Sequence, residues 1–379
     1  MKGIELPEKT EDFSADPVEL FFDLAYVLAF SQLVSLLVHH PTWAEAGKAA
    51  LLFWLMWLPW SQFTWSANAV SGNGRRVRLI FLAGTAASVP MAASVTTAFG
   101  DGGPVFAISL AVIYALAAAT MALGLEKGSA VGRSLARFAG LTGVGTFVLV
   151  AGSFLAGDAR IAAWLVAVAI IVAALVRAGD GTWIVRVGHF AERHALIYII
   201  ALGEVIVAIG NPVIEGLQDG EGIPGATLGA LAASAVFAGL LWWAYFDRVG
   251  PSLEHRAGQL DDSARSRYVR DVYTVGHSII VGGVILAATG LEEIALHPDL
   301  SVPVAFRVML AGGLALGVGG VSLGVWIAYR AVAKERIVAG VVLVALVMLA
   351  GSASGLVLLV AVDVILAATL YVEHRRIEG

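Results

Sequence analysis

Cysteine is absent from the 379 residues of this chain, and charged residues are scarce. The absence of cysteine excludes disulfides, thiolate metal ligands and a cysteine nucleophile. Only 14% of the residues are charged, against roughly a quarter in soluble domains, whereas 59% are hydrophobic and the mean hydropathy is +0.84. The formal charge of −5 is small, and no basic arm predicts a nucleic-acid partner. These values predict a polytopic helical membrane protein with the lipid bilayer around it.

Apolar segments long enough to cross a bilayer as helices recur along the whole sequence. A crossing helix needs roughly 17–25 predominantly apolar residues. Twelve segments meet this requirement, near residues 18–38, 47–67, 77–98, 104–125, 135–156, 160–177, 194–212, 226–247, 269–290, 302–327, 337–351 and 354–372. We therefore predict an all-α fold, a polytopic transmembrane helical bundle of about 12 spans. The last two spans divide one apolar stretch at residues 351–355, where one kinked, tilted helix is the alternative.

Basic residues indicate the orientation, because Lys and Arg collect in cytoplasmic loops. Almost all of the 24 Lys and Arg residues fall on one side of the predicted spans. The exceptions are Lys48, Arg160 and Arg307. We therefore expect a multi-pass protein of the cell (inner) membrane with both termini in the cytoplasm. The polar, acidic residues 1–17 do not resemble a cleavable signal peptide.

The sequence also suggests an internal duplication into residues 1–180 and 181–379. Arg78 and Gly84 in one half match Arg270 and Gly276 in the other at the same offset. Two pseudo-symmetric six-helix halves would form a parallel repeat, a plan in which transporters bind substrate near the midplane, at the interface between the halves. The alternative is that apolar helices of similar composition align by chance.

Carboxylates in the first predicted span are candidates for function, because charge inside a membrane is costly. Glu19 and Asp23 are four residues apart and share one helix face. Two like charges there predict either that one holds a proton or that both meet a cation. The alternative is structural: carboxylates in a first turn cap a helix and interact favourably with its dipole. That alternative is favoured for Asp16 and applies to Glu19.

A second polar segment, residues 188–194, precedes and enters the seventh predicted span. Glu204 follows about ten residues into that span, where a carboxylate needs a partner or a proton. His189 and Glu192 have a spacing that permits joint metal binding on a helix, but no further ligands stand at a diagnostic spacing. A polar network of His189, Glu192 and Arg193 is therefore the favoured interpretation, and no metal or cofactor is predicted.

Other polar and aromatic residues lie within predicted spans. His277 is of the type that changes charge near neutral pH, and an interhelical hydrogen bond is the equal alternative. Trp57 and Trp60, with Trp242 and Tyr245, are candidates for the walls of a cavity that takes an apolar or cationic ligand. Packing and an interfacial aromatic belt are the alternative explanation.

Three further features carry less functional information. Glycines four apart, such as Gly313 and Gly317, suit close helix–helix approach. Residues 248–270 form the longest predicted cytoplasmic loop, which is basic and expected to be solvated or to face lipid headgroups. The sequence lacks a phosphate-binding loop, a nucleophile elbow and a His-Glu-x-x-His motif.

Three short motifs resemble those of one known family. They read PVELFFDL at residues 17–24, HFAER with IIALGE at residues 189–193 and 199–204, and WWAYFD at residues 242–247. Together they resemble the bacterial low temperature requirement protein A (LtrA) family over essentially the whole chain. The resemblance implies a prokaryotic integral membrane protein, associated by name with growth in the cold, and no established substrate or reaction. It points to seven residues: Glu19, Asp23, His189, Glu192, Arg193, Glu204 and Asp247.

The leading functional hypothesis is a secondary transporter or carrier-like protein in which Asp23 and Glu204 bind a proton or cation. Three residues are expected to assist: Glu19, Glu192 and His277. One alternative is a receptor or sensor for a small apolar ligand, and another is an intramembrane enzyme that uses His189 and Glu192. The expected substrate is a small molecule or an ion. The sequence is compatible with a homo-oligomer.

Overall fold

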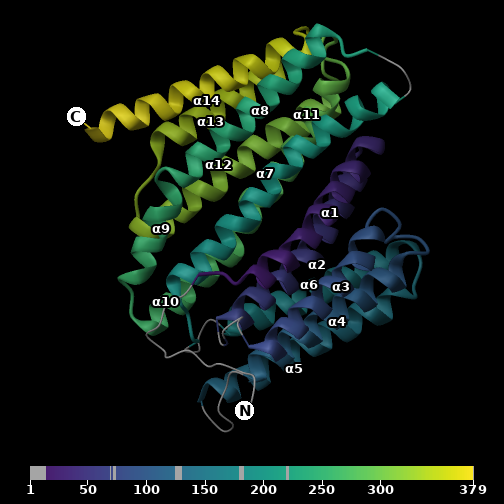
Figure 1. Cartoon of the computed structure of the whole chain (residues 1–379), viewed down its shortest axis with the longest axis vertical. Helices are drawn as coiled ribbons and strands as arrows, with labels where there is room; N and C mark the ends of the chain where they lie inside the picture. The colour runs from purple at the N-terminus through teal and green to yellow at the C-terminus, as the bar shows by residue number, and fades with distance from the viewer. Residues whose placement is uncertain are drawn as a thin grey trace. The chain divides into compact units, whose positions relative to one another are not determined.

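The computed structural model describes residues 14–68, 70, 74–123, 130–178, 183–218 and 222–378. Within these residues the protein is all-α, with fourteen α-helices, one π-helical segment and a single isolated bridge between Ser301 and Ser354 (Figure 1). The predicted all-α class is therefore confirmed. Most of the N-terminal stretch on which the signal-peptide expectation rests, residues 1–13, lies outside the described residues.

Twelve of the helices coincide with the twelve predicted spans. Their bounds are α1 (Pro17–His39), α2 (Trp43–Ala67), α3 (Arg75–Ala93), α4 (Gly103–Leu123), α5 (Ala130–Ser153), α6 (Gly157–Ala178), α7 (Val187–Gln218), α8 (Gly225–Phe246), α11 (His277–Leu296), α12 (Val304–Tyr329), α13 (Lys334–Leu349) and α14 (Gly355–Glu378). Among the described residues, ten helices are long and apolar enough to cross a membrane. The prediction of a multi-span membrane protein is confirmed, and α2 and α13 fall outside those ten.

Helix α2 is less hydropathic than its neighbours, and yet it is buried on nearly every side. Its second half, residues 51–67, is buried at every position except Trp54 and Trp65. Tryptophan, Ser61 and Gln62 lower the hydropathy of this helix, and this half of it is surrounded by other parts of the protein. A helix in the interior of a bundle needs no uniformly apolar surface, because its polar groups find partners in the protein.

The end of the chain forms two helices. Helix α13 ends at Leu349 and α14 begins at Gly355, and the two pack against each other. The intervening segment is rich in Gly and Ser, which have low helix propensity. It is held by the backbone N–H of Gly355, which donates to the carbonyl of Leu300 at 2.8 Å, and by Arg307, whose Nη1 donates to the carbonyl of Met348 at 2.8 Å. The alternative of one kinked helix is wrong.

The predicted long loop at residues 248–270 is helical. It forms α9 (Val249–Gly258) and α10 (Asp262–Val269), and the π-helical segment η1 (Arg270–Gly276) then leads into α11. The side chain of Asp261 caps α10 by accepting from the backbone N–H of Ala264 at 2.9 Å. The expectation of a segment that is solvated or faces lipid headgroups does not hold at its end, because Tyr268 and Val269 are buried, whereas Gln259 and Asp262 are exposed.

The described residues belong to two compact units that interleave along the sequence. The first is built from residues within Met1–Leu33, Gly47–Ile197 and Glu254–Thr274, and the second from residues within Val34–Ala46, Tyr198–Leu253 and Val275–Gly379. Helices α1 and α7 therefore each contribute residues to both units. These units follow from packing alone, so the predicted homologous halves, residues 1–180 and 181–379, stay a prediction.

In the first unit, aromatic rings join α1, α2 and α3. The ring of Phe22 lies 4.5 Å from that of Phe63 and 6.0 Å from that of Phe81, and Phe63 and Phe81 are 5.1 Å apart. All three side chains are fully buried. Gly84 makes this approach possible, since a Cβ atom there would lie 3.0 Å from the Phe63 ring. The cluster fixes the rotation of α1 and therefore the direction in which the adjacent Asp23 points.

In the second unit, α11 and α12 approach closely enough for their backbones to touch. A Cβ atom on Gly313 would lie 2.5 Å from the carbonyl oxygen of Gly283 and 2.6 Å from the backbone nitrogen of Ala287. A Cβ atom on Gly317, one turn later, would meet nothing within 4 Å. The expectation of close helix–helix approach is therefore confirmed for Gly313.

Gly313→Ala is expected to destabilise the protein because the added methyl group must push the two backbones apart. Overpacking of this kind costs about 1–3 kcal/mol. The thermal unfolding midpoint of the detergent-solubilised protein measures the effect, and Gly317→Ala serves as the matched control with an unchanged or slightly raised midpoint. Equal midpoints for the two variants would contradict the described packing.

The predicted orientation can be measured directly, because the chain has no cysteine of its own. Ser352, between α13 and α14, and Gln259, after α9, are both exposed. With both termini in the cytoplasm, a membrane-impermeant maleimide added to whole cells is expected to label Ser352→Cys. It is expected to label Gln259→Cys only after permeabilisation. The opposite pattern would reverse the orientation, and labelling of both from outside would refute the span count between them.

Candidate functional site

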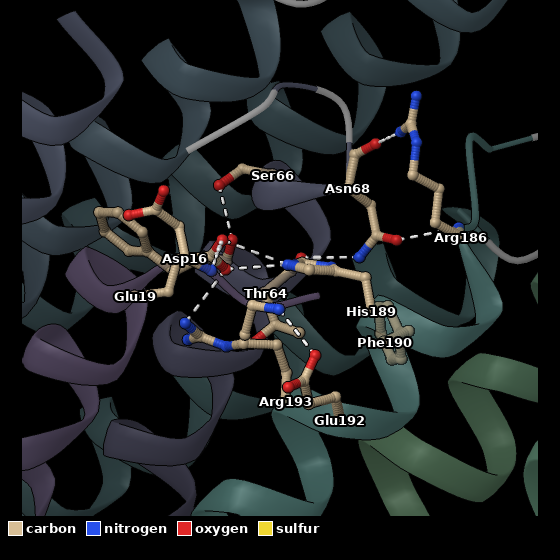
Figure 2. A network of polar contacts seen from close by, with 12 residues as sticks. Asp16, Glu19, Thr64, Ser66, Asn68, Arg186, His189, Phe190, Glu192 and Arg193 are labelled. Carbon is tan, nitrogen blue, oxygen red and sulfur yellow. Dashed lines mark hydrogen bonds and ion pairs between the residues drawn. The ribbon is translucent and has the colours of Figure 1, made fainter. Parts of the chain in front are cut away.

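Four charged or ionisable side chains meet in the interior of the first unit. Glu19 and Asp23 lie one turn apart near the start of α1, and His189 and Arg193 lie one turn apart near the start of α7. All four residues have 0% exposure. We call them the charged cluster; Figure 2 shows Glu19, His189 and Arg193 pointing toward one another from the two helices. Four of the predicted site residues are thus brought together.

The guanidinium group of Arg193 bridges the two carboxylates. Its Nη1 donates to Oε2 of Glu19 at 3.1 Å, and its Nη2 donates to Oδ1 of Asp23 at 2.8 Å. The imidazole Nε2 of His189 lies 3.0 Å from Oε2 and 3.2 Å from Oε1 of Glu19. The matched one-turn spacing on both helices makes this arrangement possible, since residues i and i+4 lie on the same helix face.

Asp23 receives a further hydrogen bond from α2. The indole Nε1 of Trp60 donates to Oδ1 of Asp23 at 2.7 Å, and the Trp60 ring lies 5.9 Å from the guanidinium carbon of Arg193. The other carboxylate oxygen, Oδ2 of Asp23, is buried and has no hydrogen-bond partner among the described residues. A buried carboxylate oxygen without a donor is costly in its charged form.

The charged cluster does not balance its own charge when His189 is neutral. Two carboxylates then face one guanidinium, which leaves one excess negative charge in the buried interior of the first unit. A proton on His189 or on Asp23, or a bound cation, removes the excess. The site can therefore exist in two charge states that differ by one proton or one cation.

Glu19 also helps to begin α1. Asp16 is the N-cap: its Oδ1 accepts from the backbone N–H of Val18 at 3.1 Å, and Pro17 occupies the first helical position. Oε1 of Glu19 accepts from the backbone N–H of Asp16 at 3.3 Å, which completes a capping box. The capping alternative is therefore confirmed for both residues, and Glu19 combines it with membership of the charged cluster.

Glu192 binds a different partner from its neighbours on α7. Its Oε2 accepts from the backbone N–H of Ala15 at 2.7 Å and so holds the segment that precedes α1. Figure 2 shows its carboxylate on another side of α7 from the His189 imidazole. Among the described residues, no three His, Asp or Glu side chains are grouped so as to hold a metal ion.

The other predicted site residues lie in the second unit. Glu204 is buried on α7, with 1% exposure. His277 is buried, and its Nε2 lies 2.6 Å from the hydroxyl oxygen of Tyr245. Asp247 is exposed at the end of α8 and pairs with Nε of Arg248 at 3.1 Å. The expected hydrogen bond of His277 is present, and the proposed roles of all three residues stay predictions.

The tryptophans of α2 that were expected to line a cavity are packed in the first unit. Trp57 and Trp60 are buried, with ring centroids 4.8 Å apart. Nε1 of Trp57 donates to the carbonyl of Thr274 at 2.7 Å. That carbonyl belongs to η1, where the regular α-helical hydrogen-bond pattern is interrupted. Their role as cavity walls stays a prediction.

The aromatic residues of α8 differ in their surroundings. Trp242 is 45% exposed and stacks on Phe246, with ring centroids 5.1 Å apart. Tyr245 is buried and lines a cavity of the second unit that holds about 780 Å³ of empty space, its open mouth included. The role of Trp242 and Tyr245 as walls of a ligand-binding cavity stays a prediction.

The sequence patterns did not reveal a buried contact between the amide of Asn68 and Arg186. Asn68, directly after α2, accepts at Oδ1 from the backbone N–H of Arg186 at 2.9 Å, and its carbonyl accepts from Nη1 of Arg186 (Figure 2). Its Nδ2 donates to the carbonyl of Thr64 at 3.0 Å. By sequence, Arg186 is one of the many basic residues on the predicted cytoplasmic side. The available signal was Asn68 itself, because a polar amide next to a largely apolar helix needs hydrogen-bond partners.

An all-α bundle with ten membrane-spanning candidates among its described residues and a buried ionic cluster defines a multi-span integral membrane protein. The sequence matches the family described as bacterial low temperature requirement A protein (LtrA) over residues 14–371. The chain belongs to this family, which confirms the resemblance inferred from the three motifs. A protein of Rhizobium meliloti (strain 1021), described as uncharacterized, is 26% identical over 328 residues, covering 83% of this chain and 77% of that protein. No solved structure is significantly similar to the chain.

Replacing Arg193 by Gln is expected to lower stability strongly, because two buried carboxylates then lose the guanidinium that bridges them. Removal of one partner from a buried ion pair costs about 3–5 kcal/mol. The thermal unfolding midpoint in detergent measures the loss, with Arg177→Gln as the control at an exposed position of α6. Adding Glu19→Gln and Asp23→Asn to Arg193→Gln is expected to restore part of the midpoint. A midpoint equal to that of Arg177→Gln would show that the cluster contributes nothing.

Proposed function

We propose that the protein is a secondary transporter coupled to protons, with the charged cluster as its proton-binding site. One observation carries the proposal: two buried carboxylates share one guanidinium, and Oδ2 of Asp23 has no partner among the described residues. Ionisable groups inside a membrane protein are costly, and they commonly mark ion pathways and proton relays.

Asp23 is the group that takes the proton. A proton on its Oδ2 removes the excess negative charge and turns an unpartnered acceptor into a hydroxyl donor. Glu19 already has two side-chain partners, Nη1 of Arg193 and Nε2 of His189, so it has less need of a proton. His189 touches Glu19 and is of a residue type that passes protons near neutral pH, which makes it the donor to the cluster.

A proton on Asp23 also changes the ionic contact between α1 and α7. When Asp23 is charged, Arg193 binds carboxylates one turn apart on α1 and so ties α1 to α7. When Asp23 is neutral, the bond from Nη2 of Arg193 loses its ionic character. An ion that alters the balance between two conformations must interact differently with each of them. A proton on Asp23 satisfies this requirement within the first unit.

The transporter hypothesis also assigns roles to Glu204, His277 and Glu192. Glu204 is a second intramembrane acid, buried as such a site requires, and it needs its own test. His277, paired with Tyr245, is proposed to assist it. Glu192, which holds the segment before α1, is proposed to set the geometry of the cluster. The cargo is a small molecule or ion of unidentified class.

Asp23→Asn is expected to abolish proton movement while the fold is kept, because Asn is nearly isosteric and cannot take up a proton. Protein in liposomes loaded with a pH-sensitive dye is driven by an imposed membrane potential, and the rate of internal acidification is measured. The variant should fall to the rate of protein-free liposomes. Glu204→Gln tests the second acid in the same way.

Asp158→Asn is the matched control, since the same substitution is made at an exposed acid near the start of α6 and the wild-type rate should persist. Infrared difference spectra between mildly acidic and mildly alkaline buffer give an independent readout. The wild type should show the carbonyl band of one protonated carboxylic acid that Asp23→Asn lacks. Equal acidification rates for wild type and folded Asp23→Asn refute the proposal.

A further inference from the structure

A second feature of the first unit lies apart from the charged cluster. A cavity opens between α2, α4, α5, α6, α10 and η1, and it holds about 540 Å³ of empty space, its open mouth included. Small-molecule sites are commonly largely apolar, with a few polar groups that orient the ligand. The cavity has this composition, with aliphatic and aromatic walls and a small polar region.

Helix α2 separates this cavity from the charged cluster. Leu58, Ser61, Gln62 and Trp65 line the cavity, and their i, i+3, i+4, i+7 spacing places them on one face of the helix. Trp60, which donates to Asp23, does not line the cavity and belongs to another face of α2. A ligand in the cavity is therefore bound by groups that take no part in the proposed proton site.

Aromatic rings form one wall of the cavity. The ring of Trp183 lies 6.3 Å from that of Trp65 and 6.1 Å from that of Phe138, in edge-to-face arrangements. Both indole N–H groups already have acceptors: Trp65 donates to Oγ1 of Thr274 at 3.1 Å and Trp183 to the carbonyl of Ala178 at 2.7 Å. The wall therefore offers hydrocarbon surface, which suits the apolar body of a ligand.

The polar region of the cavity contains one acceptor without a partner. Oε1 of Gln62 is buried and has no hydrogen-bond partner among the described residues, and Gln62 as a whole is only 4% exposed. A buried polar atom left unpaired costs free energy, which a ligand that pairs with it would recover. Gln62 is thus the group in this cavity that points to a specific ligand atom.

The charge at the cavity is already compensated. Arg270 lines the cavity, but its Nε donates to Oδ1 of Asp271 at 2.7 Å and its Nη1 donates to the carbonyl of Val176 at 3.0 Å. The remaining polar groups are hydroxyls, and Ser61 donates to Oγ1 of Thr274 at 3.2 Å. An uncharged ligand therefore fits better than an ion.

We propose that this cavity binds a small uncharged amphiphile, an apolar body that carries one hydroxyl group. The body packs against Trp65, Trp183 and Phe138, and the hydroxyl pairs with the Gln62 amide. A hydroxyl both donates and accepts, so it matches the amide in either orientation of its oxygen and nitrogen. This site goes beyond the proposed transport function and does not depend on it.

Quenching of tryptophan fluorescence tests the proposal, because bromine quenches indoles at short range. ω-Bromodecanol carries the hydroxyl, bromodecane lacks it, and ω-bromodecanoic acid replaces it by a charge. In the wild type, ω-bromodecanol is expected to quench saturably and to bind about tenfold more tightly than either other probe. Trp183→Phe should remove part of the quenchable signal.

Gln62→Leu is expected to make the affinity for ω-bromodecanol equal to that for bromodecane. Gln259→Leu, the same substitution at an exposed glutamine, is the matched control and should keep the wild-type preference. If Gln62→Leu does not fold, Leu175→Phe provides the second variant: it fills the cavity from α6 and should weaken binding of both probes.

The source of a natural ligand is distinguished by extraction of the purified protein and mass spectrometry. A membrane lipid with a free hydroxyl that accompanies the wild type but not Gln62→Leu identifies a lipid. Binding of ω-bromodecanol without any co-purifying lipid supports a free small alcohol.

Equal quenching by the three probes in the wild type overturns the proposal, as does an unchanged preference in folded Gln62→Leu or tighter binding of the acid.

Discussion

The bridge from Arg193 to Glu19 and Asp23 is the interaction on which the rest of the first unit depends. Two acids one turn apart on a membrane helix cannot stay charged unless positive charge reaches them from another element. Arg193 supplies it from a helix whose start lies about 170 residues later in the chain. Because His189 and Arg193 are also one turn apart, the two helices match in register as well as in charge. The cost of burying these groups thus favours one docking of α1 against α7, since any other leaves charges unpaired.

Helix α2 links this bridge to the remainder of the unit. Trp60 on one face donates to Asp23, and Phe63 packs against the ring that precedes Asp23. Trp57 and Trp65 bind the carbonyl and hydroxyl of Thr274, so the π-helical segment η1 is fixed against the same helix. Its low hydropathy and the burial of its residues 51–67 have one cause: this part of the helix packs against its neighbours and supplies their polar partners.

The extent of the helices could be predicted because span length and hydropathy are local properties. Charged residues inside apolar segments also stood out, so Glu19, Asp23 and Arg193 were identified, although not which of them would pair. The contact of Glu192 with the backbone N–H of Ala15, before α1, could not be inferred from its spacing to His189. A single glutamine in a tryptophan-rich helix gave no signal, because Gln62 becomes unusual only when the surrounding helices leave its oxygen without a donor.

The sequence by itself determined that this protein is a helical membrane protein of the LtrA family and where its helices lie. It also determined which charged residues lie in apolar segments, where burial of charge costs free energy. Only the tertiary structure decided which charges meet, that a capping glutamate also serves the charged cluster, and that α2 divides that cluster from a cavity. The physical reason is that helix formation depends on neighbours along the chain, whereas pairing depends on how each helix is rotated. That rotation is set by rings and glycines that come from distant parts of the sequence.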